Sequence, residues 1–383
     1  MSKNLVSSNK RSLNKNPLLK PKRRRLFNFT VPIPRRLKQF GKVYVIGSNE
    51  LSQCGIEGLE SAKQLKLINN LEKFKIVDII VGSIHNAAIT DDGKIVTWGT
   101  NDHGALGQFT ETPKSEEAIS IYEAGKYNII NEEIPEYAEG LDNVNIVKVA
   151  CRDNATFALS DQGHLYAMGT FKGKDGFIGF SYDKRIEQPI FTRYTLFKNF
   201  TIIDIVAGVD HALALTKDGD VYAWGSNEAF RLRKRNLERR PINSLIPFNL
   251  GLKYIVRLYA GSYHNFALDK SGKVWVFGFN NMGQCEEFAA GEHHTLVCIE
   301  NGQVFRAGDH ISFAIDNDNK IYSWGFGDNY VLGNKSEKDE ISPFQIQISN
   351  ELVGSDIIRL SCGTSHVLFL IVQPTNDSDV TLT

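Results

Sequence analysis

The stretch IIDIVAGVDHALALTKDGDVYAWGSN, Ile202–Asn227, contains the pattern that decides the fold. An apolar run leads through a glycine to a polar residue and a histidine. Two segments with period-two alternation follow, which is typical of short strands with one buried face. The KDGD link between them predicts a tight hairpin turn, because glycine readily adopts a positive φ. The stretch therefore predicts a strand hairpin that follows an apolar run.

The same pattern returns along most of the chain. Strands that repeat in this way, with no helical periodicity between them, indicate a β-propeller or a sandwich, and the repetition favours the propeller. The other full or partial copies begin at Ile76, Ile146, Ile255, Phe288, His310 and Ile357.

The two ends of the chain predict how the ring closes. The last copy, Ile357–Val372, lacks its closing hairpin, and an isolated hairpin segment, KVYVIGSNELSQCG, begins at Lys42. If both ends share one blade, the sheet has no free edge. We therefore predict an all-β, seven-bladed β-propeller over residues 40–372, closed by N- and C-terminal strands in one blade, with a short C-terminal tail at 373–383.

Two spacings depart from this pattern. Gly308 follows Gly278, and Gly325 follows Gly308, much more closely than Gly278 follows Gly225. A four-stranded blade does not fit between Gly308 and Gly325 at ordinary strand length. We interpret the gaps after Cys285 and after Gly308 as places where the outer half of a blade is missing from the chain.

Charge is distributed unevenly. Residues 1–42 contain 13 Lys and Arg and no acidic residue, whereas the chain as a whole is neutral. We expect residues 1–39 to form a disordered basic tail that contacts DNA phosphates. Its densest run would serve as a nuclear import signal for importin, through Lys20, Lys22, Arg23, Arg24 and Arg25.

Several classes of protein are disfavoured. A membrane-spanning helix takes roughly 20 apolar residues in a row, and the chain has no such run, so we expect no membrane partner. No apolar stretch follows the basic N-terminus, which disfavours a secretory signal. The five cysteines never have CxxC spacing, which favours reduced, mostly buried thiols. No phosphate-binding GxxxxGK[ST] loop, metal-ligand spacing or nucleophile–base pattern occurs, so we predict no cofactor, no metal and no covalent chemistry.

The repeat unit resembles the regulator-of-chromosome-condensation family. The matching features are AGxDHxxAL followed by xDGxVYAWGxN, and the GALG and QCG tails; ubiquitin ligases and channel-binding modules share them. More specific is AMGTFKGKDGFIGF, Ala167–Phe180, which replaces the usual GxNxxGQLG tail and resembles the exchange factors for the small GTPase Ran. The resemblance implies a protruding β-wedge built from Phe171, Lys172, Gly173, Lys174, Asp175 and Gly176.

The resemblance also implies further contacts. One propeller face would bind Ran through Glu50, Asp153, Asp210, His293 and His366. A basic loop, Phe230–Pro241, would contact the nucleosome, including its histones, through Arg231, Arg233, Lys234 and Arg235. For the repeat histidines the alternative is a structural role between blades, and for the loop it is a solvated connector.

The function implied is that of a chromatin-associated nuclear exchange factor, which generates Ran-GTP for nucleocytoplasmic transport and mitosis. The alternative is a non-catalytic scaffold or partner-recognition propeller of the same fold.

Overall fold

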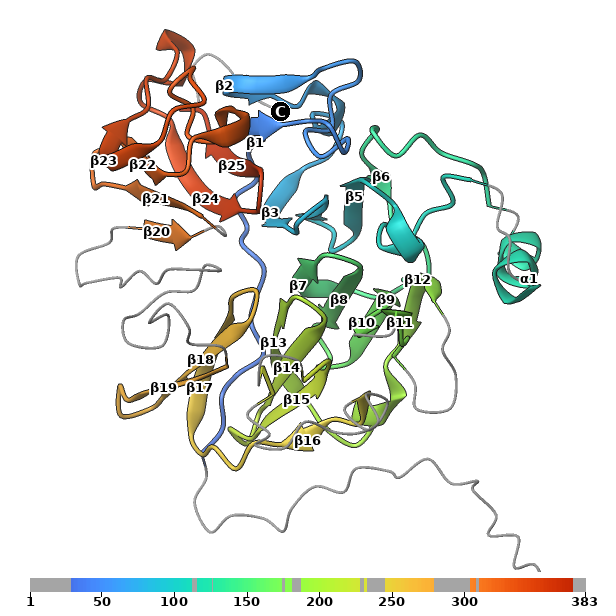
Figure 1. The fold of residues 1–383 in the computed structure, drawn as a ribbon. Coiled ribbons are helices and arrows are strands. Elements are labelled where there is room, and N and C mark those ends of the chain that lie inside the picture. The colour runs from blue at the N-terminus through green and yellow to red at the C-terminus, as the bar shows by residue number, and fades with distance from the viewer. Residues whose placement is uncertain are drawn as a thin grey trace, which may run out of the picture.

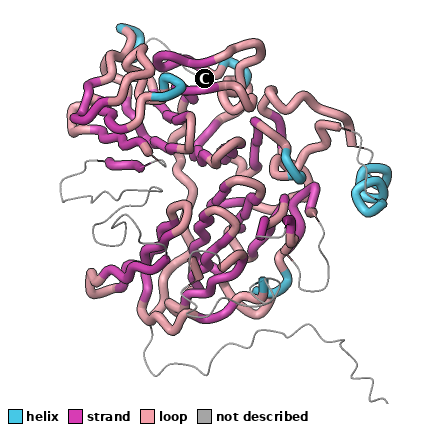
Figure 2. The backbone as a smooth tube through the Cα atoms, in the orientation of Figure 1, coloured by secondary structure: helices cyan, strands magenta, loops and turns pink. Residues whose placement is uncertain are grey.

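The computed structural model describes residues 29–111, 116–125, 127–173, 176–180, 187–227, 231–232, 245–278, 304–307 and 310–374. Within these residues, six antiparallel sheets of three or four strands follow one another around a ring (Figure 1), and the backbone view shows that strands and loops make up nearly all of it (Figure 2). The fold is an all-β propeller, as the repeats predict.

We number the sheets as blades 1–6 in chain order and give their strands from the innermost outward. Short turns of 3₁₀ helix lie in the connections, among them η2 (Asp102–Gly104), and α1 (Glu116–Gly125) lies between β5 and β6. Blade 1 contains β3 (Ile76–Val81), β4 (His85–Thr90), β5 (Ile95–Gly99) and β6 (Glu136–Tyr137). Blade 2 contains β7 (Ile146–Arg152), β8 (Ala155–Ser160), β9 (Leu165–Gly169) and β12 (Gln188–Arg193). Blade 3 contains β13 (Ile202–Gly208), β14 (His211–Thr216), β15 (Val221–Gly225) and β16 (Phe248–Asn249). Blade 4 contains β17 (Ile255–Ala260), β18 (His264–Asp269) and β19 (Val274–Gly278). Blade 5 contains β20 (Val304–Ala307), β21 (Ile311–Ile315), β22 (Ile321–Gly325) and β23 (Glu340–Gln345). Blade 6 contains β24 (Asp356–Cys362), β25 (His366–Val372), β1 (Lys42–Ser48) and β2 (Ser61–Leu67).

Ring closure is confirmed in blade 6. The N-terminal strand β1 pairs antiparallel with the C-terminal strand β25, in a register that runs from Lys42 opposite Ile371 to Gly47 opposite His366. The two ends of the chain therefore share one sheet, in which β1 and β25 are each paired on both sides.

The blades differ from the prediction in one instructive place. The predicted copy that begins at Phe288 contains Val304–Ala307 and is followed by the short spacing from Gly308 to Gly325. In the structure Val304–Ala307 forms β20, the innermost strand of blade 5, paired with β21. The short spacing from Gly308 to Gly325 is therefore not a blade spacing, and blade 5 has all four strands. The rest of the predicted copy that begins at Phe288 lies in residues 279–303, outside the described part.

Close backbone contacts explain the glycine at the end of the third strand in blades 1–5. Gly225 at the end of β15 has φ +110°, and a Cβ there would lie 2.4 Å from the carbonyl oxygen of Asp210. The turn between β13 and β14 thus packs directly on this glycine, so a side chain does not fit. Trp98 and Trp224, one residue before such glycines, are completely buried.

Polar bonds join neighbouring blades. Completely buried repeat histidines bond the second strand of the next blade: His85 Nε2 lies 2.8 Å from Thr156 Oγ1, His211 Nε2 lies 2.9 Å from Asn265 Oδ1, and His366 Nε2 lies 2.6 Å from Asn86 Oδ1. Innermost strands of neighbouring blades also form two ion pairs, Lys148–Asp204 and Arg359–Asp78.

Residues 29–41, most of which the sequence assigned to the tail, lie across one face of the ring. The Val31 amide donates to Lys217 O at 3.0 Å, and the Arg36 guanidinium donates to Ile146 O at 2.9 Å and Asp91 O at 3.0 Å. Val31, Ile33 and Leu37 pack against buried cores of the blades. This segment is the blue coil that passes β17 and β13 on its way to β1 in Figure 1.

Candidate functional site

The antiparallel order of strands defines two faces of the ring. In each blade, the turn between the first and second strands lies at the same end as the loop between the third and fourth strands. The DDGK-type hairpin turns join the second and third strands and lie at the other end. We call the first end the wedge face and the other the hairpin face. Residues 29–41 lie on the hairpin face, because Lys217 and Asp91 belong to hairpin turns.

The predicted wedge lies in the third-to-fourth-strand loop of blade 2. It contains a short ladder of two strands, β10 (Lys172–Gly173) and β11 (Gly176–Phe177), in which Lys172 pairs with Phe177 and Gly173 with Gly176. Lys172 is exposed. Lys174 and Asp175, also assigned to the wedge, lie outside the described residues.

The root of the wedge is anchored in the core. Phe171 is 1% exposed, and its carbonyl accepts a hydrogen bond from the Ile178 amide at 2.9 Å, while the Gly179 amide donates to the Thr170 hydroxyl at 3.0 Å. These bonds close the loop into a neck next to the aromatic cluster of blades 2 and 3.

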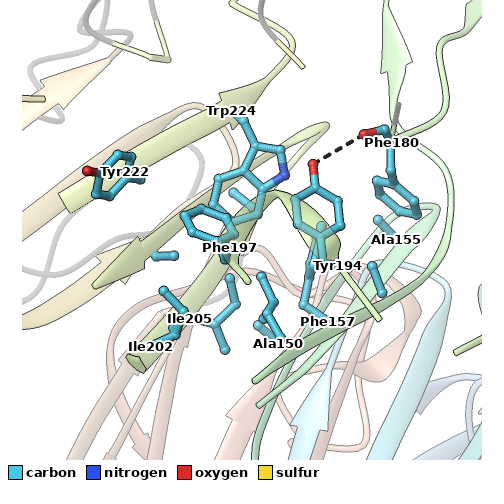
Figure 3. Close-up of a cluster of buried hydrophobic side chains, with 14 of the residues drawn as sticks. Ala150, Ala155, Phe157, Phe180, Tyr194, Phe197, Ile202, Ile205, Tyr222 and Trp224 are labelled. Carbon is cyan, nitrogen blue, oxygen red and sulfur yellow. Dashed lines mark hydrogen bonds between the residues drawn. The ribbon is translucent and has the colours of Figure 1, made fainter. Parts of the chain in front are cut away.

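Aromatic rings fill the space beneath the neck (Figure 3). Phe180 contacts Phe171 and Phe157 edge to face, at centroid distances of 5.0 and 5.5 Å, and the Tyr194 hydroxyl donates to Phe180 O at 3.3 Å. Trp224 of blade 3 packs against Tyr194 and Phe157. Aromatic residues bury large apolar areas with defined geometry, so the wedge starts from a fixed base.

Asp210 links the wedge to blade 3. It lies in the turn between β13 and β14 with φ +56°, and its carboxylate accepts a hydrogen bond from the Lys172 amide at 2.7 Å. The Arg231 guanidinium is 4.0 Å from the same carboxylate. Asp210 therefore lies on the wedge face, but its carboxylate is largely engaged within the molecule.

Asp153 and Glu50 are more accessible. Asp153 occupies the equivalent turn of blade 2 with φ +29°, accepts a hydrogen bond from the Ser83 hydroxyl, and has a side chain 30% exposed. Glu50 is exposed and follows β1, the third strand of blade 6, so it too lies on the wedge face. The face therefore presents carboxylates together with the β10–β11 hairpin.

The family assignment rests on a match to most of the chain. A family model described as an RCC1-like domain matches residues 42–310. This chain belongs to the RCC1 family. A second model, the regulator of chromosome condensation (RCC1) repeat, matches residues 318–370.

Curated relatives agree with this RCC1-family assignment. The chain is 34% identical over 351 residues to protein pim1 of Schizosaccharomyces pombe, covering 85% of this chain and 63% of pim1, so it spans less than two thirds of that relative. It is 27% identical over 414 residues to guanine nucleotide exchange factor SRM1 of Saccharomyces cerevisiae, covering 84% of this chain and 85% of SRM1.

Solved structures show the same fold. The crystal structure of Prp20p from Saccharomyces cerevisiae, described with its binding to Gsp1p and histones, matches with a TM-score of 0.73 at 22% identity over 90% of this chain and 94% of that one. Yeast RCC1 (Prp20) bound to Kap60 matches with a TM-score of 0.74 at 22% identity, over 95% and 97%.

His366 does not occupy the position that its assignment to the binding face requires. It is completely buried and bonds Asn86 of blade 1, and burial lowers its pKa to about 3. Burial likewise lowers the pKa of His85 and of His211 to about 4. In this RCC1-family ring these histidines are neutral bridges between blades, so the structural alternative holds for His366. His293 lies outside the described residues.

Arg231 also differs from its assignment to a chromatin-contacting loop. It is 5% exposed, donates to Val209 O at 2.6 Å, and lies 4.5 Å from the centre of the Tyr263 ring. Its charge serves the turn of Asp210 and is not presented to a partner. Outside the described residues lie Arg233, Lys234 and Arg235 of the same loop and Lys20, Lys22, Arg23, Arg24 and Arg25 of the tail.

His103 and Glu187 were missed by the sequence reasoning. The His103 ring lies 3.5 Å from the Phe177 ring of the wedge, centre to centre, and its Nδ1 is 2.5 Å from Glu187 Oε1. His103 falls in the tail of the blade 1 repeat, and both partners belong to blade 2, far away along the chain. Local sequence therefore carried no signal for this contact.

Two negative findings concern the described residues. Among them, no group of three or more His, Cys, Asp or Glu side chains is placed to hold a metal ion. The same residues include no helix with the length and apolar content needed to cross a bilayer.

Proposed function

We propose that this chain is a guanine nucleotide exchange factor for the small GTPase Ran. The observation that carries the proposal is the β10–β11 hairpin, which follows directly on a buried aromatic base and lies on the face that also presents Glu50 and Asp153. The name of the relative SRM1, a guanine nucleotide exchange factor, supports it.

An exchange factor acts by binding alone. It binds the nucleotide-free GTPase more tightly than the loaded one, and because coupling is reciprocal, it lowers the affinity for nucleotide by the same factor. A rigid protrusion that enters the phosphate site supplies this difference, since it fits only when Mg²⁺ and phosphate have left. The carboxylates around it would meet a basic surface of the GTPase and set the orientation of docking.

We further propose nuclear, chromatin-associated action. The basic tail would bind importin and DNA phosphates, and the loop that contains Arg233, Lys234 and Arg235 would bind the acidic surface of the nucleosome. The reported binding of Prp20p to histones and of Prp20 to Kap60 supports these partners. The seven-blade count, a disordered tail before the segment that lies on the ring, and a C-terminal tail at residues 373–383 remain predictions.

The binding face can be tested by release of a fluorescent guanine nucleotide from Ran. Asp153→Ala should raise KM for Ran about fivefold to tenfold, as expected when one partner of a partly exposed charge pair is removed. Asp318→Ala is the matched control, because Asp318 is an exposed acid in a hairpin turn on the opposite face. Equal KM values for the two variants would refute the placement of Ran on the wedge face.

A further inference from the structure

The wedge is held from two sides by different blades. On the blade 3 side, the Asp210 carboxylate accepts from the Lys172 amide on β10 at 2.7 Å. On the blade 1 side, the His103 ring of η2 packs on the Phe177 ring of β11, with 3.5 Å between centres and 41° between planes. Each strand of the wedge thus has its own support.

This short hairpin needs such support. Each of its strands has only two residues, and an isolated two-stranded hairpin is marginally stable in water even when longer. Gly173 and Gly176 form one of its two pairs and add no side-chain packing. Contacts from outside the hairpin must therefore fix its direction.

The turn that carries His103 is itself firmly placed. Next to it, Gly104 has φ +78°, and a Cβ there would lie 2.7 Å from the Pro189 Cα and 3.1 Å from the Gln188 carbonyl oxygen. The turn η2 of blade 1 therefore packs directly against the start of β12 in blade 2, the blade that bears the wedge. Glu187, just before β12, bonds His103 Nδ1 at 2.5 Å and fixes the plane of the ring.

We propose that His103 is a positioning residue for nucleotide exchange. It acts by holding Phe177, and with it strand β11 of the wedge. The inference rests on the proposed exchange function. It names the blade 1 turn as the support that, with Asp210, aims the wedge.

Two variants separate the ring from the backbone. His103 has φ +55°, so Ala and Phe at this position bear the same left-handed backbone, and only Phe keeps a ring against Phe177. We expect His103→Ala to lower kcat for nucleotide release from Ran about tenfold, the factor that corresponds to ~1.4 kcal/mol and to the upper range for an aromatic pair. KM for Ran should change less than about twofold, and His103→Phe should retain most of kcat.

The matched control is His164→Ala, a histidine in the hairpin turn of blade 2 at the opposite face, which should match the wild type. The inference is overturned if His103→Ala also matches the wild type. It is equally overturned if His103→Phe loses kcat as fully as His103→Ala does and both lose thermal stability, because that describes a merely structural role.

A second measurement does not depend on exchange activity. Amide hydrogen exchange of the isolated full chain should speed up at Lys172, Phe177 and Ile178 in His103→Ala, and stay unchanged in the hairpin turns. Unchanged protection at these amides would overturn the inference even if the wild type proved active. If the wild type failed to accelerate nucleotide release while this protection changed as expected, the proposed function would fail and the support of the wedge would stand.

Discussion

Acidification should destabilise the propeller through its buried histidine bridges. His85, His211 and His366 are completely buried between blades, and burial lowers the pKa of the first two to about 4 and of the third to about 3. In the unfolded chain each titrates near its ordinary value of about 6.5. Between these values the unfolded state binds more protons than the folded state, so the free energy of unfolding falls as pH falls.

The magnitude follows from the interval crossed. At pH 5 the solution is about 1.5 units below the pKa of the unfolded histidines and still above the pKa of the folded ones. Lowering the pH from 7 to 5 therefore lowers the free energy of unfolding by ~2 kcal/mol for each histidine and by ~6 kcal/mol for the three together. A typical domain has only about 5–15 kcal/mol to lose. Glu139, whose pKa burial raises, opposes the trend. Burial of Asp92 is outweighed by hydrogen bonds from Thr90 and Lys94 that lower its pKa, so this carboxyl contributes only at more acidic pH.

Urea unfolding at pH 7 and pH 5 measures the effect, with fluorescence of the buried Trp98 and Trp224 as the signal. The variant with Gln in place of all three histidines keeps an amide donor for each bridge but cannot titrate, so its midpoint should vary much less with pH. The single His85→Gln variant should remove about a third of the dependence. A wild-type midpoint that is the same at both pH values, or a triple variant as acid-sensitive as the wild type, would refute the reasoning.

Three further predictions concern stability. Asp204→Asn should lower the free energy of unfolding by about 2 kcal/mol, and Lys148→Met should lower it by less than about 1 kcal/mol. The two differ because the Asp204 carboxylate, besides its ion pair with Lys148, accepts a hydrogen bond from the Leu258 amide at 3.2 Å. Equal losses measured by urea unfolding would contradict this. Gly225→Ala should cost about 3 kcal/mol or more, against about 1 kcal/mol for Gly251→Ala, which has a positive φ but open space; thermal unfolding distinguishes them. Arg36→Ala should free residues 29–41 from the hairpin face, seen as faster limited proteolysis there with the ring left intact.

The sequence predicted the propeller and its closure because both depend on local pattern. Alternation, the DDGK-type turns and the two incomplete ends are visible without any tertiary contact. The same pattern does not say which place in a blade a short strand takes. Val304–Ala307 belongs by pattern to the copy that begins at Phe288, but it forms the first strand of blade 5, paired with β21.

The site was predicted only in part, for a related reason. The wedge and the acidic turns stand out as departures from the repeat, and the structure places Asp153, Asp210 and Glu50 on one face. Arg231 lies in a loop rich in basic residues, which predicts exposure. In the structure its guanidinium donates to Val209 O and lies over the Tyr263 ring, and both partners belong to turns outside that loop. His103 gave no local signal, since its role depends on the packing of blade 1 against blade 2.

The central claim is tested most directly by the rate of fluorescent guanine nucleotide release from Ran, with this chain present in catalytic amounts and a variant that lacks Lys172–Asp175 beside it. The account predicts many-fold acceleration by the wild type and loss of that acceleration in the deletion variant, with the same ring stability by thermal unfolding. If a folded wild type gives no acceleration, the exchange-factor assignment is contradicted, and a partner-recognition scaffold of the same fold takes its place.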